Sequence, residues 1–331
     1  MDKIVLLAKQ PGITSFTSLY NVKRAFNTTK VGHTGTLDNF AQGLLVVCTG
    51  RLTKLAGHII EFDKSYKAVL RFGTETDTLD YEGNVVKNEP LPDEETVRKV
   101  VASFVGEQDQ KPPVFSAIHV DGKRASELVR KGVDVELPSR KITVYSADIL
   151  DMKLDSNGGV QACLIDFSVS KGTYIRCLAR DIGQACSSAA HLIGLYRTRV
   201  GNFDINDAAG FEALPDFDIQ TCQSFADKKK IITKADDENL KDEIVKKARN
   251  FDEQTARLCG FMILHLKDIQ SEQDFRFGRP IHKSFFTEKV LIQNTQDIFA
   301  VFTPQGLFCG LLACKDFEKQ HLGYKMVIQD I

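Results

Sequence analysis

The chain has 331 residues, 43% hydrophobic and 26% charged, which is typical of a globular protein with about two domains of ~150 residues each. Its formal net charge of −1 excludes nucleic-acid binding through an overall basic charge. The apolar run after Met1 is too short for a signal peptide, and no stretch reaches the ~20 apolar residues of a membrane-spanning helix, so we expect a cytoplasmic protein without a membrane partner.

Charge and cysteine are distributed unevenly along the chain. Residues 1–60 carry seven Lys and Arg side chains against two acidic ones, which indicates a local basic face of the kind that contacts phosphates. The eight Cys residues form no CxxC pair, and the seven His residues are dispersed. This pattern predicts buried free thiols, and it indicates neither a disulfide framework nor a metal site.

The first predicted elements are a strand and an amphipathic helix. Residues 4–7 form a short apolar run, and a Pro-Gly pair at 11–12 follows it. Thr14 or Ser15 can cap a helix that continues to about residue 26. The apolar spacing predicts one buried stripe on this helix, formed by Phe16, Leu19, Val22 and Phe26.

Residues 31–50, VGHTGTLDNFAQGLLVVCTG, hold one carboxylate, that of Asp38, in a loop rich in Gly, Thr and His. The short apolar run at 44–47 predicts a buried strand directly after this loop. A rigid strand next to a loop is a common platform for chemistry. A lone Asp in such a loop is also typical of a turn or cap, and the residue pattern alone leaves both interpretations open.

Alternating side chains predict a half-buried strand over residues 65–72, with Tyr66 near its start. Such a Tyr is commonly a core aromatic whose hydroxyl reaches the surface. Asp93 is expected to cap the next helix, and a Pro-Pro pair at 112–113 then opens an irregular segment. Asp121-Gly122 predicts a tight turn in this segment, with Lys123 and Arg124 at its tip. The residue pattern alone indicates an exposed basic loop.

Two further strands are predicted at 142–150 and 160–169, joined by the hairpin signal Asn157-Gly158. A helix then begins near Gly172, with Arg176 and Arg180 one turn apart on its surface. Two such Arg side chains are usually solvated.

The C-terminal third reads as a charged insert followed by a small β-rich unit. Residues 228–250 are charge-rich, with a marginal helical stripe at Leu240 and Ile244. Short strand-like runs follow at 261–266, 290–292, 298–302, 307–312 and 325–328.

Several of these stretches resemble, in the same order, the motifs of the bacterial TruB family of tRNA pseudouridine synthases. Residues 32–45, GHTGTLDNFAQGLL, match the family pattern GHTGxLDPxAxGxL except at Asn39. The other matching stretches are KQPGITS at 9–15, Tyr-Lys-Ala at 66–68, GTETDTLD at 73–80, VSKGTYIR at 169–176 and LYRTRVGNF at 195–203. The resemblance therefore covers about residues 1–205 through separate motifs.

The resemblance implies an α+β fold with a mixed, largely antiparallel central sheet, flanking helices and a small C-terminal PUA-like RNA-binding module. We expect a catalytic domain over 1–212 with a thumb-like insertion at about 111–140, a charged linker or insert over 213–256, and the β-rich domain over 257–331. Ser126 stands where the family usually has Tyr, which marks a difference in the segment expected to grip RNA.

The resemblance further implies that a monomer isomerises uridine 55 in the T-loop of tRNA to pseudouridine, without a cofactor, a metal or a required protein partner. Asp38 would be the catalytic carboxylate, either as nucleophile or in deprotonation of the sugar, with Arg176 as its partner. Tyr66 would stack on the flipped-out base and exchange a proton. The positions that match contacts to RNA or base are His33, Tyr66, Lys123, Arg124, Lys171, Tyr174 and Leu195.

Two other functions remain possible interpretations of the sequence. A guide-RNA-dependent rRNA pseudouridine synthase of the dyskerin type shares the Asp loop but usually lacks the thumb, so the segment at 112–132 favours the stand-alone tRNA enzyme. A tRNA-binding or folding module without catalysis is the second alternative, and the presence of Asp38, Tyr66 and Arg176 together argues against it.

Overall fold

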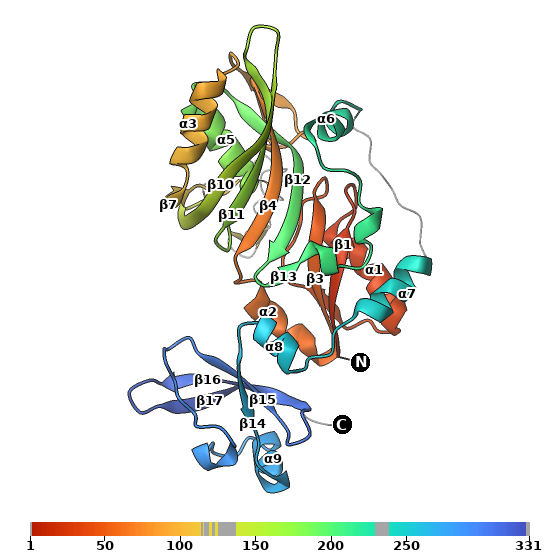
Figure 1. The fold of residues 1–331 in the computed structure, drawn as a ribbon, viewed down its shortest axis with the longest axis vertical. Coiled ribbons are helices and arrows are strands. Elements are labelled where there is room, and N and C mark those ends of the chain that lie inside the picture. Colours follow the sequence, from red (N-terminus) through yellow and green to blue (C-terminus); the bar gives the residue numbers. More distant parts are fainter. Residues whose placement is uncertain are drawn as a thin grey trace.

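The computed structural model describes residues 2–113, 115, 119–120, 123–124, 137–228 and 238–328. Its largest sheet has nine strands in the order β1-β3-β12-β4-β11-β10-β7, with β2 on β3 and β13 on β12 (Figure 1). Among the described strands of this sheet, only β3 and β12 run parallel, which confirms the predicted mixed, largely antiparallel sheet. The strands are β1 (Ile4–Lys9), β2 (Val31–His33), β3 (Gln42–Thr49), β4 (Lys64–Phe72), β7 (Gly106–Gln110), β10 (Arg140–Leu154), β11 (Val160–Val169), β12 (Ala190–Val200) and β13 (Phe203–Asp204).

Helices cover both faces of this sheet. α3 (Glu94–Ser103) and α5 (Ile175–Ala185) pack on one face of β4, β10 and β11, where Val97, Leu178 and Ile182 are buried in the core. α6 (Ile219–Lys228) covers the opposite face. α1 (Ser15–Phe26) and α7 (Glu238–Lys247) lie together over β1 and β3 (Figure 1). The fold is therefore α+β.

Strands β1 and β3 are buried on both faces. Along β1, Val5 and Leu7 face α1 and α7, while Ile4 and Leu6 face the opposite core. A strand buried on both sides needs apolar residues at successive positions, which explains the uninterrupted apolar run at 44–47.

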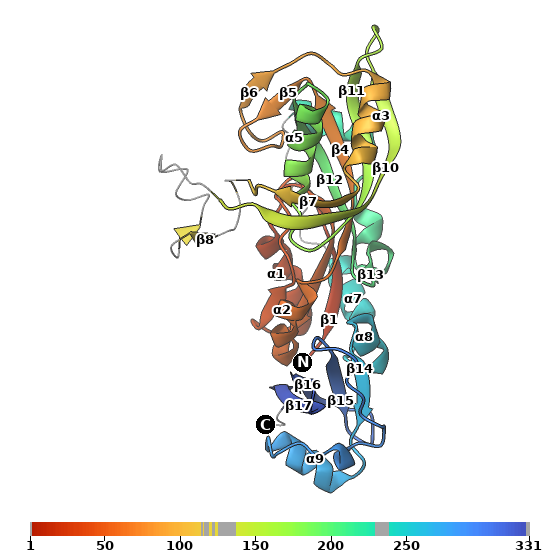
Figure 2. The same cartoon turned by 90° about the vertical axis from the view of Figure 1, so that its left-hand side faces the viewer.

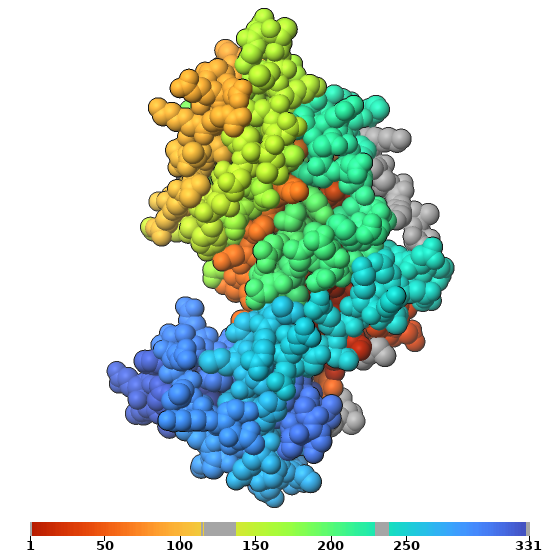
Figure 3. Space-filling model, viewed as in Figure 1, coloured from red at the N-terminus to blue at the C-terminus, as the bar shows by residue number. Residues whose placement is uncertain are grey.

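A second sheet of four strands, in the order β14-β15-β16-β17, forms the lower lobe in Figure 3. Its strands are β14 (Met262–His265), β15 (Ile298–Phe302), β16 (Phe308–Asp316) and β17 (His321–Val327). Phe302 and Leu311 share a core with Leu52 and Ile59, which lie in η1 (Gly50–Leu55) and α2 (Ala56–Ile59). α8 (Glu253–Leu258) precedes this sheet, and α9 (Ile269–Arg276) and η4 (Lys283–Phe285) lie between β14 and β15 in the chain.

The remaining elements are short. β5 (Thr74–Thr76) pairs with β6 (Val85–Asn88), and β8 (His119–Val120) pairs with β9 (Lys123–Arg124), while η2 (Ile205–Asp207) and η3 (Phe211–Ala213) follow β13. Strand β8 stands out to the side of the molecule in Figure 2. The predicted turn at 121–122, most of the helix expected at 124–130, and Ser126 lie outside the described residues. No helix in the described part of the chain has the length and apolarity needed to cross a membrane.

Two sequence-based expectations differ from the structure. Residues 290–292 form no strand. Val290 and Ile292 are buried instead as irregular chain that packs against the second sheet. Phe16 is 70% exposed instead of joining Leu19 and Val22 in the buried stripe of α1. The segment at 228–250 was expected to be an insert or linker with a marginal helix, and the helical stripe predicted at Leu240 and Ile244 is confirmed by α7, whose Ile244 is fully buried.

Candidate active site

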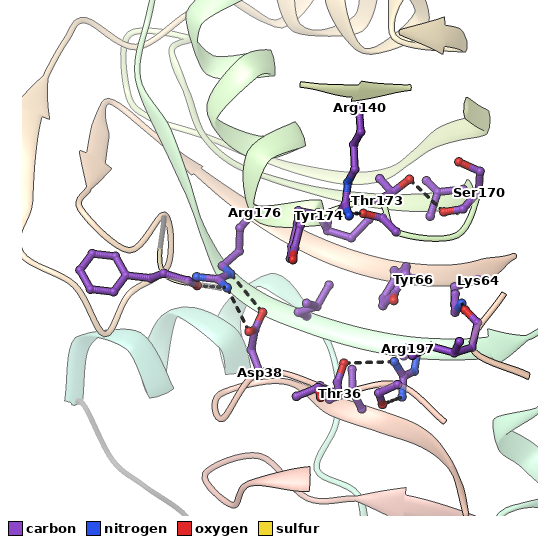
Figure 4. A pocket seen from close by; sticks show the side chains of 18 residues that line it. Thr36, Asp38, Lys64, Tyr66, Arg140, Ser170, Thr173, Tyr174, Arg176 and Arg197 are labelled. Carbon is purple, nitrogen blue, oxygen red and sulfur yellow. Dashed lines mark hydrogen bonds and ion pairs between the residues drawn. The ribbon is translucent and has the colours of Figure 1, made fainter. Parts of the chain in front are cut away.

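A cleft of about 480 Å³ opens beside β4 and β12 (Figure 4). Its lining comes from the loop before β3, the starts of β4 and β10, the segment between β11 and α5, and β12. Its charged, aromatic and leucine lining includes Asp38, Lys64, Tyr66, Arg140, Tyr174, Arg176, Leu195 and Arg197. Residues far apart in the sequence therefore meet around one concave surface.

The loop that carries Asp38 is fastened to β12 by Arg197. The buried guanidinium donates to the carbonyls of Leu44 at 2.8 Å, Gly35 at 3.1 Å and Thr36 at 3.4 Å. Gly43 has φ +116°, and a Cβ there would lie 2.3 Å from the Arg197 carbonyl oxygen. A side chain at Gly43 would push the two strands apart, so this glycine allows the close approach that the clamp requires.

The same loop is also held from β1 and α1. The fully buried Lys9 ammonium donates to the carbonyls of Ala41 at 2.6 Å, Gln10 at 3.0 Å and Asn39 at 3.2 Å, and burial lowers its pKa to about 7. Ser15 Oγ accepts from the Leu37 amide at 2.9 Å. Hydrogen bonds on both sides of Asp38 thus leave its backbone little freedom.

Asp38 and Arg176 form a two-point ion pair. Arg176 Nη2 donates to Asp38 Oδ1 at 3.1 Å, and Nε lies 3.1 Å from Oδ2 without the alignment of a hydrogen bond. The Arg176 side chain is 7% exposed, whereas that of Asp38 is 34% exposed. The guanidinium is therefore buried behind the carboxylate, which faces the cleft, and the contact implied by the family resemblance is present.

A second carboxylate, Asp80, shares Arg176. Arg176 Nη1 donates to the Thr78 carbonyl at 2.8 Å and lies 3.4 Å from Asp80 Oδ2, and Nη2 donates to the Phe115 carbonyl at 3.0 Å. Burial raises the pKa of Asp80 to about 6, although hydrogen bonds from Thr78 and Glu82 and the Arg176 charge act in the opposite direction. Asp80 anchors the guanidinium from the side away from the cleft.

The rest of the cleft is a slot of aromatic and aliphatic side chains. Tyr66 on β4 and Leu195 on β12 come from adjacent strands. Tyr174 is held by Gln110, which accepts from its amide at 2.8 Å and donates to its carbonyl at 3.1 Å. The Arg140 guanidinium lies 4.5 Å from the centre of the Tyr174 ring. Aromatic and aliphatic side chains beside a carboxylate offer apolar contact to a planar base attached to a sugar.

The charged side chains that line the cleft are predominantly cationic. Asp38 is accompanied by Lys64, Arg140, Arg176 and Arg197. The Lys64 ammonium donates to the carbonyls of Ile60, at 2.6 Å, and Phe62, and burial lowers its pKa to about 8. Such an excess of positive charge favours an anionic ligand.

Four of the predicted site residues lie elsewhere or are incompletely described. His33 on β2 is half-buried and does not line the cleft, and its Nδ1 has no hydrogen-bond partner among the described residues. Burial lowers the His33 pKa. Lys171 is exposed and forms an ion pair with Glu61. For Lys123 and Arg124 the structure describes only the backbone, in β9.

Sequence reasoning missed Lys64, Asp80, Arg140 and Arg197 as parts of the site. Asp80 and Arg197 lie inside motifs that were recognised, at the end of GTETDTLD and in LYRTRVGNF. Their position within those motifs was a usable signal. Arg140 lies in none of the recognised motifs, so its place over Tyr174 could be found only from the structure.

A family model and several named proteins match this chain. The family model described as TruB family pseudouridylate synthase (N terminal domain) matches residues 23–175. The tRNA pseudouridine synthase B of Treponema denticola is 39% identical over 332 residues, covering 93% of this chain and 92% of that protein. The enzyme of the same name from Borreliella burgdorferi (strain ZS7) is 40% identical over 237 residues, covering 71% of this chain and 83% of that protein.

A solved structure shares the fold at low sequence identity. A crystal structure of a Cbf5-Nop10-Gar1 complex matches with a TM-score of 0.64 and 22% identity, covering 99% of this chain and 84% of that one. The similarity to the Treponema protein extends over nearly the full length of both chains, and together with the family-model match it shows that this chain belongs to the TruB family of pseudouridine synthases.

Proposed function

We propose that this protein isomerises uridine to pseudouridine in tRNA, at position 55 in the T-loop, with Asp38 as the catalytic carboxylate. The observation that carries the proposal is the Asp38–Arg176 pair, which presents a partly exposed carboxylate beside the Tyr66 and Leu195 slot. The names of the relatives from Treponema and Borreliella support tRNA as the substrate.

The reaction breaks the bond between uracil N1 and sugar C1′, turns the base, and forms a bond from C5 to C1′. The C5 hydrogen leaves and N1 gains a proton, so no atoms are added and no oxidant or reductant is needed. Asp38 acts either by attack on C1′ or by removal of a sugar proton. Both roles need a carboxylate held in a fixed position, and the two-point ion pair with Arg176 holds it there.

The target base must leave a folded RNA loop before it can reach Asp38. Extrusion costs a few kcal/mol, and stacking on an aromatic side chain returns ~1–3 kcal/mol. Tyr66 and Tyr174 provide rings that line the cleft, and Lys64, Arg140 and Arg197 supply positive charge near the RNA backbone. The cleft thus offsets the cost of extrusion with contacts that only an extruded nucleotide can make.

The direct test is incubation of an unmodified tRNA transcript with the protein alone, followed by mapping of pseudouridine. We expect one modified position, in the T-loop. A requirement for added guide RNA would favour the dyskerin-type alternative. Tight tRNA binding without any pseudouridine would favour the non-catalytic alternative.

Replacement of Tyr66 by Leu is expected to lower turnover far more than RNA affinity. Leu keeps an apolar side chain in the slot, but it lacks the ring and the hydroxyl that would exchange the proton. The fall in kcat should be about 10²-fold or more, the usual contribution of one positioned proton-transfer group. Tyr66→Phe separates the ring from the hydroxyl, and equal losses of kcat and affinity in Tyr66→Leu would assign Tyr66 to grasping the RNA only.

RNA binding should weaken steeply with salt. Each neutralised phosphate releases counterions, so contacts to about four phosphates give a slope of about −3 in a plot of log affinity against log salt. The seven Lys and Arg side chains against two acidic ones in residues 1–60, together with Arg140 at the cleft, motivate this expectation. Fluorescence anisotropy of a labelled T-arm stem-loop, at salt concentrations from about 50 to about 200 mM, measures the slope. A flat response would contradict the role given to these charges.

The domain boundaries follow from the same proposal. Residues 1–212 form the catalytic domain, with Lys123 and Arg124 in its RNA-gripping insertion, 213–256 connect it to the C-terminal unit, and 257–331 form a second RNA-binding module. His33 and Lys171 contact RNA outside the cleft. We place the protein in the cytoplasm as a monomer that needs no protein partner, cofactor or metal.

A further inference from the structure

Helix α1 presents an exposed face of aromatic and basic side chains. Phe16 is 70% exposed and Tyr20 is 57% exposed. The Lys23 ammonium lies 4.8 Å from the centre of the Phe16 ring, and the Arg24 guanidinium lies 5.7 Å from that of Tyr20. We call Phe16, Tyr20 and Lys23 the α1 face, since their spacing of four and three residues places them on one side of the helix.

The α1 face is not required for the core of the protein. Leu19 and Val22 are the apolar side chains that α1 buries against β1, β3 and α7. Leaving a Phe side chain mostly in water forgoes about 2 kcal/mol of burial. A sequence that departs from the local apolar pattern in this way often does so at a functional surface.

The α1 face begins next to the catalytic loop. Ser15, the residue before Phe16, exchanges hydrogen bonds with both the amide and the carbonyl of Leu37, and Leu37 precedes Asp38. The Gly12 amide also donates to the Asn39 carbonyl at 2.8 Å. Figure 2 shows α1 and strand β8 on the same side of the molecule. The first residue of α1 and the chain before it are thus hydrogen-bonded to the loop that carries the proposed catalytic carboxylate.

The chemistry of the α1 face matches an unpaired nucleotide. Residues 3–37 contain no acidic side chain, so no carboxylate of this stretch competes with a phosphate for Lys23. Arg24 is also paired with Glu238 of α7, at 2.8 Å, which leaves Phe16, Tyr20 and Lys23 as the part of the face that we assign to a ligand. Aromatic rings with adjacent cations bind single-stranded nucleic acid by stacking and phosphate contact.

We propose that the α1 face binds the RNA substrate next to the extruded uridine, with one unpaired T-loop base stacked on Phe16 and a neighbouring phosphate near Lys23. This inference rests on the proposed function, because it assigns the ligand to the same RNA. It adds a second contact outside the cleft, which would fix the direction of the strand as the target base enters.

The test measures equilibrium binding of a synthetic T-arm stem-loop in the Asp38→Asn background, so that the readout does not depend on turnover. Phe16→Leu keeps an apolar side chain without a ring, and Phe16→Trp keeps a ring. We expect Phe16→Leu to raise Kd about ten-fold, within the range for loss of one stacked base, and Phe16→Trp to retain the affinity. Because Phe16 is largely exposed, the melting temperature should not change in either variant.

Stem-loops with an abasic site on either side of the target identify the stacked base. One of them should bind the parent protein about ten-fold more weakly and should show no further loss with Phe16→Leu. Lys23→Gln should reduce the salt slope by about one. The inference is overturned if Phe16→Leu binds the intact stem-loop as tightly as the parent Asp38→Asn protein does. It is also overturned if the affinity losses from Phe16→Leu and from the abasic site multiply, or if Phe16→Leu weakens binding only of whole tRNA. An absence of pseudouridine formation by the wild-type protein would instead count against the proposed function.

Discussion

Asp38→Asn is expected to abolish pseudouridine formation while the protein still binds tRNA. The amide keeps the size of the side chain and one acceptor oxygen, but it can neither attack C1′ nor take a proton. Turnover should fall at least about a thousand-fold, toward the upper end of what one positioned acid–base group supplies. Single-turnover kinetics with excess protein measure the fall, and filter binding of the same RNA measures the affinity.

Asp148→Asn is a matched control for this variant. It makes the same chemical change at an exposed position of β10, away from the residues that line the cleft. Its turnover should equal that of the wild-type protein. If Asp38→Asn and Asp148→Asn had the same turnover, the catalytic role of Asp38 would be excluded.

Arg176→Met should lower both turnover and stability. The substitution leaves Asp80, with a side chain only 6% exposed, without its cation and releases Asp38 from its fixed position. Breaking a buried ion pair from one side costs ~3–5 kcal/mol, and about 3 kcal/mol is expected because Asp38 can be hydrated. Loss of alignment should reduce turnover about a hundred-fold or more. Urea unfolding and single-turnover kinetics provide the two measurements.

The stability loss in Arg176→Met should depend on pH through Asp80. Its pKa is raised by burial from 3.8 to about 6 in the folded protein, so the native state takes up a proton before the unfolded chain does. Protonation of Asp80 removes the buried charge that the loss of the guanidinium leaves unpaired. The Arg176 charge lowers this pKa in the wild type, so its loss raises the pKa further in the variant. The variant therefore regains stability relative to the wild type as pH falls from about 8 to about 6.

Arg180→Met is the control for the pH experiment, because Arg180 lies one turn further along α5 and pairs with Asp181 at a more exposed position. Its stability loss should be below about 1 kcal/mol and nearly independent of pH over this range. A loss in Arg176→Met that is equally large at pH 5 and pH 8 would contradict the assignment of the unpaired charge to Asp80.

Strands and helices with a strong apolar pattern could be predicted from the sequence. The run at 44–47 and the alternation at 65–72 correspond to β3 and β4, and Asp93 and Thr14 cap α3 and α1. Residues 290–292 are equally apolar but have no partner strand, so a local pattern could not distinguish a strand from buried irregular chain. The prediction that Phe16 is buried was wrong for a related reason, since periodicity identifies an apolar residue without showing what lies beside it.

The site could be predicted only in part. Asp38 and Arg176 are 138 residues apart, so no local rule brings them together, and their pairing was inferred from the family resemblance alone. Lys9, Lys64 and Arg197 were missed as buried groups because charged side chains are normally expected at the surface. Each is buried here because backbone carbonyls of the catalytic loop or of the chain before β4 accept its hydrogen bonds.

The most direct measurement is the release of tritium from C5 of the target uridine in a T-arm stem-loop, with protein in excess and no guide RNA. The C5 hydrogen must leave when C5 bonds to the sugar, so release reports the chemical step itself. The wild-type protein should release all of the tritium from the target, and Asp38→Asn should release none from RNA that it still binds. Release by Asp38→Asn at the wild-type rate, or no release by the wild-type protein from bound RNA, would contradict the account.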